Sequence, residues 1–411
     1  MISKRDVEEL DRADPLRAYR GRFVGADDDV IYLDGNSLGR LPVASADRLF
    51  DVVHSQWAHG LVRSWESWIS LPRTVGDLLG SALLGAAPGQ VVVSDSTSVN
   101  LYKLAAAALD LRPSRRAIVT DAGNFPTDRY VLAGLASARG LRVVEIDGVS
   151  VDAVAAALSD DVALVCLSHV DYRSGALASM AEITAAAHDA GALVLWDLCH
   201  SVGAVPISLD ACAVDFAVGC TYKYVNAGPG APAFLYVRAD LQSIARQPIW
   251  GWFGQQAQFE MDSVYSPVES IERFLVGTPS VLGIALVESG VKLLAEAGIA
   301  RLRAKGSALT SLVIALADEW LAPLGFEVAS PRSDAQRGSH VSLRHADAYR
   351  VSRALIEHQV VPDFRRPDLV RLGCSPLTTS FAEVYEGMRR LRDIVSSGRY
   401  LEIELPERRV T

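Results

Sequence analysis

The chain has 411 residues, a formal net charge of −9 and a pI near 5.4, and half of its residues are hydrophobic. This length and composition indicate a globular protein of two or three domains. The acidic balance argues against nucleic acid or an anionic membrane surface as a partner. No apolar run reaches about 18 residues, so we expect no membrane-spanning segment. Because the first twenty residues are charged, unlike a signal peptide, we expect a cytoplasmic protein.

Residues 75–240 alternate between helical and strand patterns. Helices are predicted at 75–86 and 98–111, and short β-branched runs predict strands at 90–95, 116–121, 141–147, 162–170, 192–201, 215–220 and 232–237. Strands without polar alternation are buried on both faces, and helices between them indicate a mainly parallel sheet. We therefore predict a large three-layer α/β domain over residues 60–285.

The pattern changes after residue 285. Long helices are predicted at 281–298 and 301–325, and short strands at 340–345 and 369–376. This mixture predicts a second, smaller α+β domain, made of residues 286–411 together with residues 1–59. The five cysteines contain no C-x-x-C pair, so we expect reduced, buried thiols and no metal site.

Several polar residues follow the predicted strands. Ser96, Thr97 and Ser98 lie between a strand and a helix, where the helix dipole favours a phosphate, although for these residues taken alone ordinary N-capping is the favoured interpretation. Asp197 and His200 end another strand. Because open α/β sheets bind ligands at the carboxyl ends of their strands, these groups are expected to share one crevice.

Lys223 follows the strand at 215–220 and precedes a glycine-rich turn. The chain has only five lysines among its 40 basic residues, so a lysine at this place suggests a need for an amine. An amine condenses with an aldehyde, whereas a guanidinium does not. Pyridoxal phosphate needs such a lysine, a carboxylate for its ring nitrogen and a helix N-terminus for its phosphate. The alternative is an ordinary surface lysine.

Seven motifs in chain order carry a resemblance to a known family. They are YLDGNSLGRLP, SDSTSVNLYK, NFPTDRYV, WDLCHSVGAVP, CTYKYVNAGPGAP, GWFG and FLVGTPS. Together they closely resemble the kynureninases of the bacterial type, which are fold-type I (aspartate aminotransferase-like) enzymes. The resemblance covers residues 31–381 and implies a pyridoxal 5'-phosphate cofactor and a homodimer with shared active sites.

The resemblance also implies a role for each matching residue. Lys223 would form the Schiff base, Asp197 would face the pyridine nitrogen, and Tyr222 would hold the phosphate and donate a proton. The remaining cofactor-binding residues would be Thr97, Ser98, Phe125, Asp128, Ser168 and His200, with Trp252 and Thr278 from the neighbouring subunit. The substrate would be bound by Arg371, Trp65, Ser37 and Gly277, with Arg371 holding the α-carboxylate.

The implied reaction is the hydrolysis of L-kynurenine to anthranilate and L-alanine, through a ketimine of the cofactor with Cβ–Cγ cleavage. It belongs to tryptophan catabolism and the kynurenine pathway, which supplies NAD biosynthesis. Trp65 and Gly277 match the members that prefer an unsubstituted ring. Gln255 replaces a histidine of the family pattern and Thr378 replaces a tyrosine, and both departures concern the aromatic end of the substrate.

Three alternatives remain. The first is a kynureninase-like enzyme that acts on a ring-substituted kynurenine in secondary metabolism. A cysteine desulfurase or C–S lyase of the same fold group would need a nucleophilic cysteine, for which Cys374 is the candidate. A pyridoxal phosphate-binding regulator would carry a DNA-binding domain, for which the acidic chain leaves only about 30 residues before the first motif.

Overall fold

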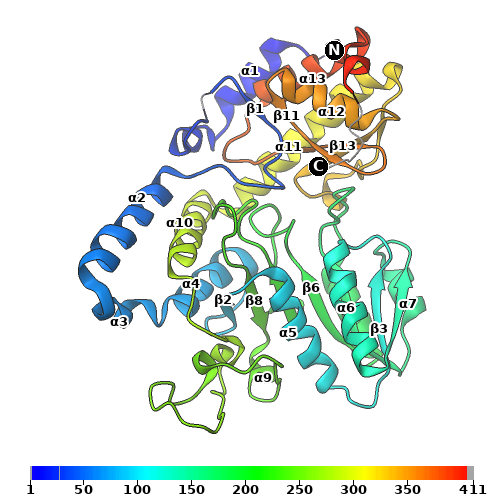
Figure 1. Cartoon of the computed structure of the whole chain (residues 1–411). Coiled ribbons are helices and arrows are strands. Elements are labelled where there is room, and N and C mark those ends of the chain that lie inside the picture. The colour runs from blue at the N-terminus through cyan, green and yellow to red at the C-terminus, as the bar shows by residue number, and fades with distance from the viewer. Residues whose placement is uncertain (1, 27, 405–411) are drawn as a thin grey trace.

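The computed structural model describes residues 2–26 and 28–404 and shows two parts with separate sheets (Figure 1). The larger part contains a seven-stranded sheet in the order β2-β8-β7-β6-β5-β3-β4. The strands of this sheet are β2 (Val91–Val93), β3 (Ala117–Asp121), β4 (Arg142–Ile146), β5 (Val162–Ser168), β6 (Leu193–Asp197), β7 (Phe216–Gly219) and β8 (Phe234–Val237). β3 to β7 pair in parallel, and β8 is antiparallel to both of its neighbours. The seven predicted strands and the mainly parallel sheet are confirmed.

Helices cover both faces of this sheet. One face packs against α5 (Thr97–Asp110) and α6 (Pro126–Arg139), and the other packs against α4 (Leu71–Leu79), α8 (Met180–Asp189) and α10 (Val281–Ala297). The short helices of this part are α3 (Trp65–Trp68), α7 (Val151–Ala157) and α9 (Ala239–Gln242). Figure 1 shows α5 and α6 side by side in front of the strands. The three-layer α/β architecture is therefore confirmed, and its strands are buried because helices lie on both sides.

The smaller part contains a four-stranded sheet in the order β12-β13-β10-β9 and a short parallel pair, β1-β11. The strands are β1 (Ile31–Tyr32), β9 (Glu327–Val328), β10 (His340–Arg344), β11 (Val360–Val361), β12 (Asp363–Arg365) and β13 (Leu369–Gly373). Its helices are α1 (Lys4–Ala13), α11 (Ile299–Leu316), α12 (Ala348–Glu357) and α13 (Phe381–Ser396). Val7 of α1 and Ile31 of β1 lie in the same apolar core as α11 to α13, which is why the N-terminal segment belongs to this part.

We propose a domain boundary near residue 299, after α10. The boundary expected at 285 falls inside this helix, whose buried residues Ile284, Val287, Val291 and Leu294 pack with the large sheet. The helix that follows, residues 299–324, is long and apolar enough to span a membrane by length and composition alone. Leu309, Val313 and Leu316 of this helix are fully buried in the smaller core, and core helices pass the same test.

A separate element extends from the body of the molecule. α2 (Val43–Asp51) continues into a π-helical segment (Val52–Gly60) and a short 3-10 turn (Leu61–Ser64), and Figure 1 shows these residues reaching out beside α10. We call residues 43–64 the arm. Its large exposed side chains include Phe50, Trp57 and Val62, which are 66%, 57% and 75% exposed.

Gly290 tests the close contact between α10 and the loop that carries Lys223. A Cβ at Gly290 would lie 2.0 Å from the Val225 carbonyl oxygen. We expect Gly290→Ala to lower the free energy of unfolding by about 1–3 kcal/mol, because the helix has to move away from the loop. Gly134→Ala on α6 is the matched control. A Cβ there has no neighbour within 4 Å, so better helix propensity should keep or raise stability. Equal melting temperatures for the two variants would contradict the prediction.

Candidate active site

The carboxyl ends of β5, β6 and β7 meet at one edge of the large sheet. Ser168 pairs with Asp197, and Asp197 with Val218, so the ends of these parallel strands are in register. Residues that follow β7 then place Tyr222 and Lys223 at the same edge, and the first turns of α5 and α6 lie opposite. Together these segments line a cavity of about 550 Å³.

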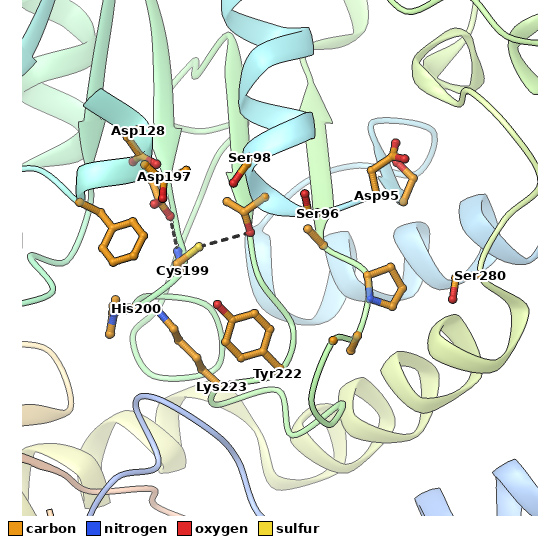
Figure 2. A pocket seen from close by; sticks show the side chains of 18 of the residues that line it. Asp95, Ser96, Ser98, Asp128, Asp197, Cys199, His200, Tyr222, Lys223 and Ser280 are labelled. Carbon is orange, nitrogen blue, oxygen red and sulfur yellow. Dashed lines mark hydrogen bonds between the residues drawn. The ribbon is translucent and has the colours of Figure 1, made fainter. Parts of the chain in front are cut away.

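Two buried carboxylates lie side by side on one wall of the cavity (Figure 2). Asp128, in the first turn of α6, and Asp197, at the end of β6, are 2% and 5% exposed. Asp197 accepts a hydrogen bond from the Cys199 backbone N–H at 2.6 Å, whereas Oδ2 of Asp128 has no hydrogen-bond partner. Burial and the Asp197 charge raise the pKa of Asp128 well above its ordinary value. The repulsion between the two carboxyl groups is relieved when Asp128 holds a proton or when a cation lies beside the pair.

Lys223 points into the cavity and is held by His200. The Lys223 Nζ lies 2.8 Å from Nε2 of His200. Burial, with the Lys223 charge next in importance, lowers the pKa of His200 well below its ordinary value, so the imidazole is neutral. A neutral imidazole can accept a hydrogen bond from the ammonium and keep its direction fixed. Sequence reasoning placed both residues at the site but did not reveal this direct contact.

Tyr222 and Phe125 supply the cavity's aromatic surfaces. Burial, followed by the Cys220 and Cys199 thiols, raises the pKa of Tyr222, so its phenol keeps its proton. Phe125 is 39% exposed and contacts Tyr172 edge to face, with ring centroids 5.3 Å apart.

Asn124 was missed by sequence reasoning. Its Oδ1 accepts hydrogen bonds from the Phe125 backbone N–H at 2.8 Å and from the Ser168 hydroxyl at 2.7 Å. Asn124 therefore holds together two residues that the motifs placed at the site. Its position directly before Phe125 in NFPTD was the available signal.

The other end of the cavity is formed by the N-terminus of α5. Ser96 caps this helix by accepting a hydrogen bond from the Val99 N–H at 3.4 Å, and the Thr97 hydroxyl lies 3.8 Å from Sγ of Cys199. Ser98 lies in the same first turn and lines the cavity. A helix N-terminus with hydroxyl groups in its first turn can bind an anion such as a phosphate.

Arg371 lies beside the cavity, not in its lining. Its side chain is fully buried, and its Nη2 donates to Ser37 Oγ at 2.9 Å and to Asp363. Nη1 donates to the Tyr172 carbonyl, and Nε faces the Asn36 amide oxygen at 2.8 Å in the amide orientation that satisfies both groups. Four of the five guanidinium N–H groups thus face protein acceptors. A carboxylate ligand has to displace at least one of them to bind in a bidentate manner.

Gly277 and Thr278 line this chain's own cavity, together with the rest of the segment 275–280. Trp65 and Trp252 are not among the residues that line it in the described part of the chain. Both instead lie near Phe253, with ring centroids 6.4 Å and 4.6 Å from it. Most of the predicted cofactor-binding residues therefore line a cavity within one chain, whereas the rings of Trp65 and Trp252 lie outside that cavity.

The two departures from the family pattern also lie outside the lining. Gln255 accepts a hydrogen bond from the Ser266 N–H at 2.6 Å and donates to the Val264 carbonyl at 3.0 Å, so its amide closes a loop. Thr378 is buried, and its carbonyl accepts a hydrogen bond from Arg20. Neither side chain faces the cavity in this chain.

The residues of the cavity fit pyridoxal phosphate. A protonated pyridine nitrogen would be stabilised beside the Asp128–Asp197 pair, and Oδ2 of Asp128 has no hydrogen-bond partner among the described residues. The N-terminus of α5 could bind the phosphate, and Lys223 offers the amine. The same cavity therefore contains each group that this cofactor requires.

Solved structures with the same fold support this class. The apo structure of a cysteine desulfurase from Thermococcus onnurineus NA1 has a TM-score of 0.82 at 20% identity and covers 92% of this chain and 98% of its own. A C-DES mutant with glycine covalently linked to its PLP cofactor has a TM-score of 0.78 at 17% identity, covering 91% and 99%. Fold and site together define a fold-type I pyridoxal phosphate-dependent enzyme.

Sequence relatives identify the family. The chain is 42% identical to kynureninase of Pseudomonas fluorescens over 403 residues, which is 96% of both chains. It is 41% identical to kynureninase of Burkholderia pseudomallei (strain 1106a) over 407 residues, 97% of this chain and 96% of the relative. A family model, Kynureninase C-terminal domain, matches residues 302–391. The chain belongs to the kynureninase family, and its cofactor is pyridoxal 5'-phosphate.

Asp34, close to Asp363 and Arg371, gives a pH-dependent test of this region. Burial, with Asp363 next, raises the pKa of Asp34 from 3.8 to about 6. The folded protein therefore binds this proton more tightly than the unfolded chain, and ionised Asp34 costs stability above pH 6. The stability advantage of Asp34→Asn over wild type should shrink by about 2 kcal/mol as pH falls from 8 to 4. Unfolding curves across this range measure it, and a pH-independent difference would refute the assignment.

Proposed function

We propose that the enzyme hydrolyses L-kynurenine to anthranilate and L-alanine. The observation that carries the proposal is the cavity that joins the Lys223–His200 contact to the buried Asp128–Asp197 pair, in a chain that is 42% identical to a kynureninase over nearly its full length. Bound pyridoxal phosphate withdraws electrons from the substrate carbons, so that the Cα proton can leave and the Cβ–Cγ bond can break.

The chain's own residues then have separate tasks. Asp197 and Asp128 would hold the pyridine nitrogen of the bound cofactor and would favour its protonated form, because buried acidic groups stabilise a nearby cation. Lys223 moves a proton at the substrate Cα, and neutral His200 directs its Nζ toward the cavity. The Tyr222 phenol keeps its proton and can donate it to the carbon that loses the acyl group. Arg371 binds the α-carboxylate once Ser37 or Tyr172 gives way.

A cysteine desulfurase or C–S lyase activity is not favoured, although solved structures of that kind share the fold. Such chemistry needs an accessible thiolate. Cys374 is fully buried, and burial raises the pKa of its thiol to about 12. It sits directly after β13 rather than on an exposed loop.

We also propose a cytoplasmic homodimer in which the active sites are shared. The arm and residues 250–264 expose large apolar side chains, including Trp250, Phe259 and Met261 at 66%, 65% and 71%. Surfaces of this kind mark protein–protein contacts. Trp65 and Trp252 adjoin these segments but do not reach their own cavity, so a partner's cavity is their proposed place. The five cysteines are free thiols, as a reducing compartment favours.

The cofactor assignment can be tested by absorbance. Purified protein should be yellow, and borohydride should bleach the band because it reduces the Lys223–cofactor linkage. Lys223→Ala should lose this covalent band. Asp197→Ala should bind the cofactor but lose nearly all turnover. Lys292→Ala, which changes an exposed lysine on α10, is the matched control and should keep the band. A colourless protein with Lys223 intact would exclude the proposed function.

Shared sites can be tested with hybrid dimers. Lys223→Ala and Trp252→Ala chains, each inactive alone, should regain up to about a quarter of wild-type activity when mixed, because half of the dimers then contain one intact site. A mixture of Lys223→Ala and Asp197→Ala chains is the control, since both residues line the same cavity and no hybrid restores it. Absence of rescue in verified Trp252 hybrids would place Trp252 and Lys223 in one chain's site.

The third test concerns the substrate ring. We expect kcat/KM for L-kynurenine to exceed that for 3-hydroxy-L-kynurenine by at least about tenfold, because a hydroxyl beside Trp65 and Gly277 lacks hydrogen-bond partners. A Cβ at Gly277 has no neighbour within 4 Å, so Gly277→Ser fits and should reduce the ratio. Equal rates on the two substrates in wild type would show that these positions do not determine selectivity.

A further inference from the structure

Lys103 is a fully buried lysine that the proposed chemistry does not use. It lies on α5 and is 0% exposed. Its Nζ donates to Asp95 Oδ2 at 2.8 Å and to the Phe274 carbonyl at 2.7 Å. Burial lowers the pKa of Lys103, and Asp95 acts in the opposite direction. A buried ammonium is costly unless it is paired, so the contact with Asp95 is required for the charge to persist.

Asp95 brings a negative charge to the phosphate end of the cavity. It directly precedes Ser96, Thr97 and Ser98, and its side chain, 31% exposed, is one of the groups lining the cavity. Figure 2 shows Asp95 and Ser96 on the side opposite Asp128 and Asp197. Asp95 has a positive φ of 50°, and its carbonyl accepts a hydrogen bond from the Ala233 N–H at 2.8 Å, so the backbone fixes its place. An unpaired carboxylate there would repel a phosphate dianion.

The second Lys103 contact reaches a different part of the cavity wall. Phe274 ends the turn Ile271–Phe274 and directly precedes the segment 275–280, which carries Gly277 and Thr278. One ammonium group therefore joins α5, whose N-terminus is the proposed phosphate site, to the base of this segment. The compact ammonium suits this place because its three donors leave in different directions, whereas a guanidinium is planar.

We propose that Lys103 is a positioning residue for the cofactor phosphate. It neutralises Asp95, so that the N-terminus of α5 presents no net negative charge to the phosphate, and it fixes the segment 275–280 against the helix. This inference rests on the proposed cofactor site. It predicts that the effect of Lys103 depends on the phosphate of the ligand and on the presence of the Asp95 carboxylate.

The test compares pyridoxal 5'-phosphate with pyridoxal, which lacks the phosphate, in absorbance titrations of full-length protein freed of cofactor. Lys103→Met should raise the dissociation constant of pyridoxal phosphate at least about tenfold and leave that of pyridoxal within about threefold. The double variant Lys103→Met with Asp95→Asn should return pyridoxal phosphate to within about threefold of wild type. Asparagine tolerates the positive φ at this position.

Lys305→Met is the matched control for loss of a buried lysine. Lys305 is 8% exposed and its Nζ lies 2.7 Å from Asp14, away from the cavity. Its variant should lose stability but keep the wild-type ratio of the two dissociation constants. If Lys103→Met does not fold, the single variant Asp95→Asn tests the inference. It should bind pyridoxal phosphate at least as tightly as wild type.

Three results would overturn the inference. They are equal weakening of both ligands by Lys103→Met, no recovery in the double variant, or weaker binding of pyridoxal phosphate by Asp95→Asn. If wild-type protein binds pyridoxal phosphate but the variants do not show the expected changes in dissociation constant, only the role of Lys103 is refuted. Wild-type protein that does not bind it refutes the cofactor site as well.

Discussion

The electrostatic cost of two adjacent buried carboxylates is the constraint on which the active site depends. Asp128 and Asp197 come from different elements, α6 and β6, and each is almost inaccessible to water. Burial and mutual repulsion raise the pKa of Asp128, so the pair requires a proton or a cation. A pyridinium ring meets this need. The same demand explains why both residues lie in rigid elements, since a mobile carboxylate would turn toward water and lose its hold on the ring.

Charged side chains in and around the cavity are balanced by neighbouring groups. Where the pyridine ring is proposed to bind, Asp128 and Asp197 would stabilise its protonated nitrogen. At the amine end, burial, with Lys223 next in importance, lowers the pKa of His200 and keeps it neutral, and at the phosphate end Lys103 balances Asp95. Arg371 is balanced by Asp363, and in the proposed function a substrate carboxylate would replace part of its hydrogen bonding.

The smaller domain and the exposed apolar segments extend this arrangement beyond the large sheet. Arg371 lies on β13 of the smaller sheet, yet it contacts Tyr172 from the large domain and Ser37 from the N-terminal segment. If Arg371 binds the substrate as proposed, binding would involve all three of these parts of the chain. The arm and residues 250–264 carry Phe50, Trp57, Phe259 and Met261 on the surface, where burial against a second subunit would remove apolar area from water.

The sequence by itself determined the α/β class, all seven strands of the large sheet, and the presence of Asp197, Tyr222 and Lys223 at strand ends, because these follow from local hydrophobic patterns and short motifs. It placed the domain boundary at 285, inside α10, because a helix pattern does not reveal which core the helix joins. Only the tertiary structure decided the contacts of Lys223 with His200, of Arg371 with Asp363, and of Lys103 with Asp95 and Phe274. In these four contacts the partners are 8 to 171 residues apart, and their pairing depends on tertiary packing and burial, which a linear pattern does not contain.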